Sequence, residues 1–107
     1  MSQDVAQARP EWKSTGSTKF PLAARVDGCW WVLRMNPFPD HCMWTLFIDG
    51  VVRYDLEKTP PDWGRLGLGS APLLDQVTTD RILAPLRGFT VYGSEAGRPC
   101  DDPFCCG

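Results

Sequence analysis

The sequence contains a single histidine, His41, and lacks the glycine-rich loop that cradles phosphate groups. Gly64, Gly67 and Gly69 follow no strand-to-helix pattern, and no lysine–serine pair comes after them. Any mechanism with a histidine base must use His41, which leaves a thiol enzyme activated by His41 as a weak hypothesis. Because no other catalytic constellation is present in the sequence, we expect a protein without enzymatic activity.

The chain also lacks a long apolar run, a secretion signal and a large net charge. No stretch approaches the roughly 20 apolar residues that span a bilayer, and residues 1–12 lack the apolar centre of a signal peptide. The formal charge of -2 over 107 residues provides no broad cationic field for phosphate backbones. We therefore expect a cytoplasmic protein with reduced thiols that binds neither nucleic acid nor membranes.

What the sequence does contain is two Asp-Gly dipeptides set between apolar runs. The first predicts a hairpin over residues 20–35, because a two-residue type I′ turn needs positive φ at both positions and Asp27 and Gly28 tolerate it. One face of this hairpin is then wholly apolar, which a one-residue slip would destroy. The predicted pairs on that face are Val26 with Cys29, Ala24 with Trp31, Leu22 with Leu33, and Phe20 with Met35.

The second dipeptide, Asp49-Gly50, predicts another hairpin over residues 43–56 and leaves two registers open. A two-residue loop is favoured because the Asp-Gly chemistry fits it, and a three-residue loop is the alternative. The first pairs Phe47 with Val52, Thr45 with Tyr54 and Met43 with Leu56; the second pairs Ile48 with Val52, Leu46 with Tyr54 and Trp44 with Leu56.

The two hairpins predict an α+β fold, an antiparallel β-meander of four to five strands with one short helix packed on it. Consecutive strands are usually neighbours in a sheet, which favours the meander. The helix lies in the C-terminal half, where Thr78 or Thr79 can cap it. Pro85 removes one helical hydrogen bond, which leaves open a division into two short pieces, the first over residues 73–77. A short β run over residues 89–92 is expected to join an edge of the sheet.

The predicted domain organisation is a polar arm followed by one domain. Residues 1–18 form the arm, which Trp12 is expected to dock against the body because burial of an indole recovers a large apolar area. Residues 19–107 form the single domain, which ends in a cysteine-rich tail. The long connection over residues 57–72 is rich in proline and glycine, and loops of this length are often functional.

The tail supplies a possible zinc site. Cys100, Cys105 and Cys106 provide three sulfurs, and His41 or Cys42 is the candidate fourth ligand, since structural zinc takes four thiolate or imidazole ligands. The spacing lacks the Cys-x-x-Cys pair that marks most zinc ribbons. Two alternatives stay open, burial of the tail cysteines as small apolar residues and redox chemistry or modification of an exposed tail.

A partner-binding surface is predicted on the reverse face of the second hairpin. In the favoured register this face presents aromatic and aliphatic side chains rimmed by opposite charges, a composition typical of protein-binding centres. The alternative is that the helix and the long loop cover the two faces of the sheet. The predicted partner-binding residues are Trp44, Leu46, Ile48, Arg53 and Asp55.

These features lead to three hypotheses. The general character of a small, slightly acidic sheet-plus-helix domain is similar to that of bacterial immunity proteins, which block a cognate toxin by occupying its site. This similarity of class implies a non-enzymatic inhibitor or adaptor that binds another protein. The alternatives are a small zinc protein, whose metal fastens the tail to the loop at residues 36–42, and a thiol-dependent enzyme.

Overall fold

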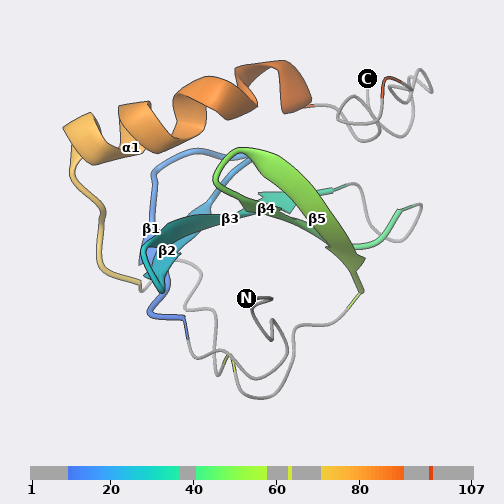
Figure 1. The fold of residues 1–107 in the computed structure, drawn as a ribbon, viewed down its shortest axis with the longest axis horizontal. Helices are drawn as coiled ribbons and strands as arrows, with labels where there is room; N and C mark the ends of the chain where they lie inside the picture. Colours follow the sequence, from blue (N-terminus) through green and yellow to red (C-terminus); the bar gives the residue numbers. More distant parts are fainter. Residues whose placement is uncertain (1–9, 37–40, 58–62, 64–70, 91–96, 98–107) are drawn as a thin grey trace.

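Five strands form one antiparallel sheet in which each strand lies beside the next one in the sequence (Figure 1). This computed structural model describes residues 10–36, 41–57, 63, 71–90 and 97. A helical segment follows the strands, so the fold is α+β, as the sequence predicts. The strands are β1 (Lys13–Ser14), β2 (Leu22–Val26), β3 (Cys29–Met35), β4 (Trp44–Ile48) and β5 (Val51–Leu56).

Both Asp-Gly dipeptides form the predicted turns. Asp27 and Asp49 each have a φ of 50°, and the glycine that follows each of them has a φ of about 80°. Positive φ at both positions is the type I′ geometry that matches the twist of the flanking strands. Two features disfavour a side chain at Gly50. Its φ is positive, and an added Cβ would lie only 3.2 Å from the Cβ of Pro85.

The first hairpin has the predicted register over most of its length. Leu22 pairs with Leu33, Ala24 with Trp31 and Val26 with Cys29. The expected pairing of Phe20 with Met35 is wrong, because β2 begins at Leu22 and Phe20 packs on the opposite face of the sheet, in the cluster beneath the helix.

The second hairpin combines the two registers that the sequence left open. Next to the turn Phe47 pairs with Val52, as a two-residue loop requires, but Leu46 pairs with Tyr54. Arg53 is therefore an extra residue on β5, and this β-bulge moves the rest of the strand by one position. The favoured pairs of Thr45 with Tyr54 and Met43 with Leu56 are wrong; Thr45 pairs with Asp55 and Trp44 with Leu56.

The helical segment begins earlier than predicted. Helix α1 (Gln76–Leu83) is capped by Asp75, whose side chain accepts a hydrogen bond from the Thr78 amide, and not by Thr78 or Thr79. This hydrogen bond lowers the pKa of the Asp75 carboxyl. The 3₁₀ helix η3 (Ala84–Phe89) follows directly, with Pro85 in its first turn, where its missing N–H is tolerated. Phe89 thus belongs to η3, and residues 91–92 of the predicted β run lie outside the described residues.

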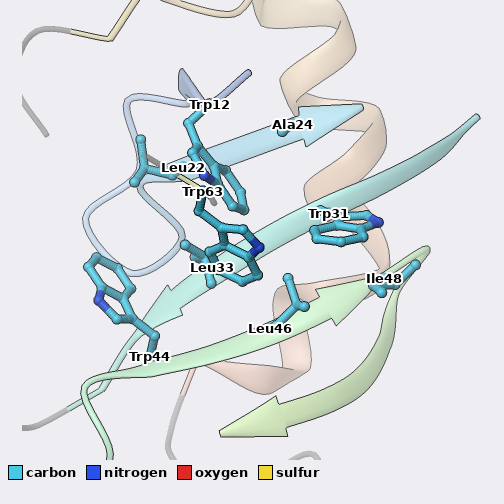
Figure 2. Packing of buried hydrophobic residues seen from close by; sticks show 9 residues of the cluster. All are labelled: Trp12, Leu22, Ala24, Trp31, Leu33, Trp44, Leu46, Ile48 and Trp63. Carbon is cyan, nitrogen blue, oxygen red and sulfur yellow. The ribbon is translucent and has the colours of Figure 1, made fainter. Parts of the chain in front are cut away.

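The sheet is covered on both faces by different means. The helical segment lies along one face (Figure 1) and buries the helix-side cluster of Phe20, Ala23, Val32, Phe47, Leu74, Ile82 and Leu86. On the other face Trp12 and Trp63 pack against strand residues, while the helix lies behind the sheet in the same view (Figure 2). We call this second group the tryptophan cluster: Trp12, Leu22, Ala24, Trp31, Leu33, Trp44, Leu46, Ile48 and Trp63.

The tryptophan cluster confirms one expectation and overturns another. Trp12 is buried and docks its segment on the sheet, as predicted, although this segment also contributes β1. The expected exposure of Trp44, Leu46 and Ile48 is wrong, because their side chains are only 3%, 0% and 6% exposed. The sequence left open what covers this face of the sheet. Among the described residues, the Trp12 and Trp63 side chains pack over it.

The two edges of the sheet differ. The backbone of β1 is bonded on its outer side, since the Ser14 amide donates to the Pro72 carbonyl over 2.8 Å and the Leu74 amide donates to the Ser14 carbonyl over 2.7 Å. Leu73 forms an isolated parallel bridge with Ser14 there. Within the described part of the chain, β5 pairs only with β4. β5 is therefore an edge of the sheet that the described residues form.

The first test concerns the buried face of β4. We expect Leu46→Ala to lower the free energy of unfolding by about 2 to 5 kcal/mol, since it leaves a cavity between close-packed side chains. The matched control is Val77→Ala, at a position 71% exposed, where a change within about 0.5 kcal/mol is expected. Urea unfolding followed by tryptophan fluorescence measures both, and equal effects would contradict the burial of Leu46.

Candidate partner-binding edge

The outermost strand has an exposure pattern opposite to that of its neighbour. Every residue of β4 is buried, whereas the first five residues of β5 are exposed and only Leu56 is partly buried. The exposed residues include three large apolar side chains, namely Val51 at 57%, Val52 at 38% and Tyr54 at 52% exposure. An edge strand with exposed apolar side chains can accept a strand from another chain.

A buried polar network lies behind this edge, on the helix side of the sheet. The Arg34 side chain is fully buried and lies over the Phe47 ring, 5.3 Å from its centroid. Its Nε donates to Asn36 Oδ1 over 2.8 Å, its Nη1 to the Phe89 carbonyl over 2.9 Å and its Nη2 to Thr45 Oγ1 over 3.1 Å. The guanidinium thereby fastens η3 to the centre of the sheet.

The network reaches the edge strand through the Thr45 hydroxyl. Thr45 Oγ1 accepts from both Arg34 and Asn36 and donates to Asp55 Oδ1 over 2.7 Å. A hydroxyl has one donor and two acceptor sites, so all of its capacity is used. The Asp55 carboxylate is therefore directed to the helix side of β5 and compensates the buried Arg34 charge through one intervening hydroxyl.

The opposite side of β5 carries Arg53. Val52 pairs with Phe47 on the helix side, so the alternation of side chains along a strand places the next residue, Arg53, on the tryptophan side. The bulge then interrupts this alternation, so that Tyr54 also lies on the tryptophan side and Asp55 on the helix side. Arg53 and Asp55 are two positions apart and yet lie on different faces.

The Cys29 thiol has a specific partner at the end of β3. It hydrogen-bonds to the Asp49 carboxylate, and this bond, followed by desolvation and the negative charges of Asp49 and Asp27, raises the pKa of Cys29 above its ordinary value of 9.0. Asp49 also ties the two hairpins together, since its Oδ1 accepts from the Trp30 amide over 2.9 Å and its own amide donates to the Trp30 carbonyl over 2.8 Å.

The structure does not bring the five predicted partner-binding residues onto one accessible surface. Trp44, Leu46 and Ile48 belong to the buried tryptophan cluster, while Arg53 and Asp55 are exposed on β5. The exposed apolar residues are instead Val51, Val52 and Tyr54. The sequence predicted Val52 and Tyr54 in pairs on the buried face of the hairpin and Val51 on its reverse face. The signal that would have found them is the position of β5 as the last strand of a meander, at the edge of the sheet.

The predicted zinc site lies mostly outside the described residues. Cys100, Cys105 and Cys106 fall there, and His41 and Cys42 are partly buried in the segment before β4. Among the residues that the structure describes, no group of three or more histidine, cysteine, aspartate or glutamate side chains is placed to hold a metal ion. Zinc binding by the tail stays a prediction, as does a thiol enzyme based on the tail cysteines and His41.

The tryptophan cluster is a packed core. The ring centroid of Trp63 lies 5.4 Å from that of Trp12 and 5.9 Å from that of Trp31, with tilts of 57° and 59° that are typical of favourable aromatic pairs. Figure 2 shows the three rings packed against one another over the strands. The buried indole N–H groups of Trp12 and Trp31 find no hydrogen-bond acceptor in the described part of the chain, which carries an energetic cost.

No family model matches the chain, and the searches of curated proteins and of solved structures return no significant match. The residues described contain no helix of the length and apolar character needed to cross a membrane.

The second test concerns Cys29. We expect Asp49→Asn to accelerate alkylation of Cys29 at pH 8, because loss of the carboxylate lowers the thiol pKa toward 9.0 and raises the thiolate fraction. Asparagine preserves the acceptor for the Trp30 amide and tolerates the turn. Site-resolved mass spectrometry of iodoacetamide labelling measures the rate at Cys29 alone.

The control for this test is Asp27→Asn, which removes a negative charge that acts on Cys29 only at longer range. A smaller acceleration is expected. Unchanged labelling of Cys29 in the Asp49 variant would show that the hydrogen bond does not control the thiol.

Proposed function

We propose that this protein is a non-enzymatic binding protein, whose partner is another protein that adds an extended segment to β5. Its place is the cytoplasm, where reduced thiols are expected, and its role is that of an inhibitor or adaptor of the immunity-protein type, which acts by occupying a surface of its partner. The observation that carries the proposal is the contrast between the buried β4 and the exposed β5, which bears Val51, Val52 and Tyr54 at an edge of the described sheet.

The physical argument rests on what an added strand would gain. The outward N–H and C=O groups of β5 can form a new ladder with an extended segment, and main-chain hydrogen bonds of this kind supply affinity. The exposed apolar side chains of β5 would at the same time be removed from water, at about 25 cal/mol per Å² of apolar area. Tyrosine is also enriched among the residues that contribute most to binding at protein interfaces.

The rigidity of the edge supports the proposal as well. Asp55 is held by Thr45, and the turn at Asp49 is held by two hydrogen bonds to Trp30. Both ends of β5 are thereby fixed before any partner arrives. Preorganisation of this kind reduces the conformational entropy that binding would otherwise cost.

The third test compares two pairs of matched substitutions in affinity capture. The double variant Val51→Asp with Tyr54→Asp places two charges on β5, and Leu73→Asp with Val77→Asp places two charges on exposed apolar positions elsewhere. We expect wild type and the Leu73 and Val77 variant to capture the same protein. The β5 variant should bind the purified partner roughly tenfold or more weakly, because charges there would be desolvated at the interface.

Unfolding curves of both double variants identify any loss of fold. Equal capture by the β5 variant, or selective loss of capture by the Leu73 and Val77 variant, would contradict the proposed surface.

A further inference from the structure

The charges around β5 are mostly negative. Four exposed carboxylates stand at this edge: Asp49 before the strand, Asp27 in the neighbouring turn, and Asp55 and Glu57 at the other end, of which Asp55 also compensates the buried Arg34. The two turns share one end of the sheet, since Asp49 forms two hydrogen bonds with Trp30, which follows the turn at Asp27. Arg53 is the single lysine or arginine within residues 44–57, and Arg25 on β2 lies two residues before Asp27.

This distribution disfavours a second copy of the chain as the added strand. In the antiparallel pairing that opposes Arg53 to its own counterpart, Asp49 also opposes Glu57, so like charges meet at three places. The pairing that opposes Arg53 to Asp55 would need both on one face, because directly opposed residues share a face. The bulge places them on different faces. Charges and bulges are the usual means by which edge strands avoid self-association.

We propose that the segment that adds to β5 is basic, with apolar residues at its centre and lysine or arginine toward both of its ends. This inference rests on the proposed function, since it specifies the chemistry of the strand that the edge receives. The apolar centre matches Val51, Val52 and Tyr54, which lie between the acidic ends of β5. Basic ends match the carboxylates of Asp49 and Glu57, whichever way the added strand runs.

Such a partner would associate under electrostatic steering. Opposite charges on two surfaces accelerate encounter, and dissolved salt screens this attraction over a Debye length of about 10 Å at 0.1 M. The affinity of a basic strand should therefore fall as ionic strength rises, while the contribution of the apolar centre persists.

The experiment uses two synthetic peptides of about ten residues, a length that spans the edge strand. Both have alternating threonine and valine at the centre, and one carries two lysines at each end where the other carries two glutamates. Each is titrated into the ¹⁵N-labelled full chain, and the amide shifts of β5 are followed by NMR at low and high salt. We expect the lysine peptide to shift the β5 amides with an affinity that falls as salt is added, and the glutamate peptide to leave them unchanged.

A charge reversal at the edge supplies the matched variant. Glu57→Lys should weaken binding of the lysine peptide roughly two- to fivefold, as expected for one exposed charge. Glu11→Lys, which makes the same change at an exposed position in the segment before β1, should leave the affinity unchanged.

Each other outcome overturns the inference in a recognisable way. If the glutamate peptide binds as well as the lysine peptide, or if Glu57→Lys has no effect, the basic chemistry is wrong while strand addition stands. If β5 amides shift with protein concentration alone, the occupant is a second copy. If neither peptide shifts them, the inference is wrong, and capture of a partner by the same edge would still test the proposed function independently.

Discussion

The structure depends on burying both sides of one strand. All five residues of β4 are buried, with Trp44, Leu46 and Ile48 in the tryptophan cluster and Thr45 and Phe47 on the helix side. A strand buried on both faces needs two covering layers. The helical segment supplies one, and the Trp12 and Trp63 side chains contribute to the other. Among the described residues β5 pairs only with β4, which makes it an edge of the sheet.

A buried charge then determines how this edge is shaped. Arg34 is fully buried on the helix side. The Asp55 carboxylate compensates its charge through the Thr45 hydroxyl, which accepts from Arg34 and donates to Asp55. Unpaired burial of a guanidinium would be costly. In the register without a bulge, residue 54 would oppose Thr45 and Asp55 would lie on the tryptophan side. The extra residue, Arg53, brings the carboxylate to the network. The same bulge separates the two charges of β5 onto different faces, which limits pairing of the edge with a copy of itself.

Local chemistry was sufficient to predict much of the fold from the sequence. The Asp-Gly turns, most of the first register, the meander and the docking of Trp12 follow from turn geometry and apolar pairing. The bulge was not predictable in this way, because it brings Asp55 to the buried Arg34. Neighbouring residues in the sequence do not reveal that the Arg34 side chain is buried. The partner-binding site was predicted in the wrong place for the same reason. Trp44, Leu46 and Ile48 form an apolar face in any register, and only the distant Trp12 and Trp63 decide that the face is core.

The availability of the β5 backbone is the central claim, and amide hydrogen exchange of the free protein tests it most directly. Measured residue by residue by NMR, exchange should be slow for the amides of β3 and β4 and for the β5 amides that face β4. The β5 amides that face away from β4 should exchange at nearly the rate of an unstructured chain. Slow exchange along both sides of β5 in the monomeric protein would show that another segment already occupies the edge, and would contradict this account.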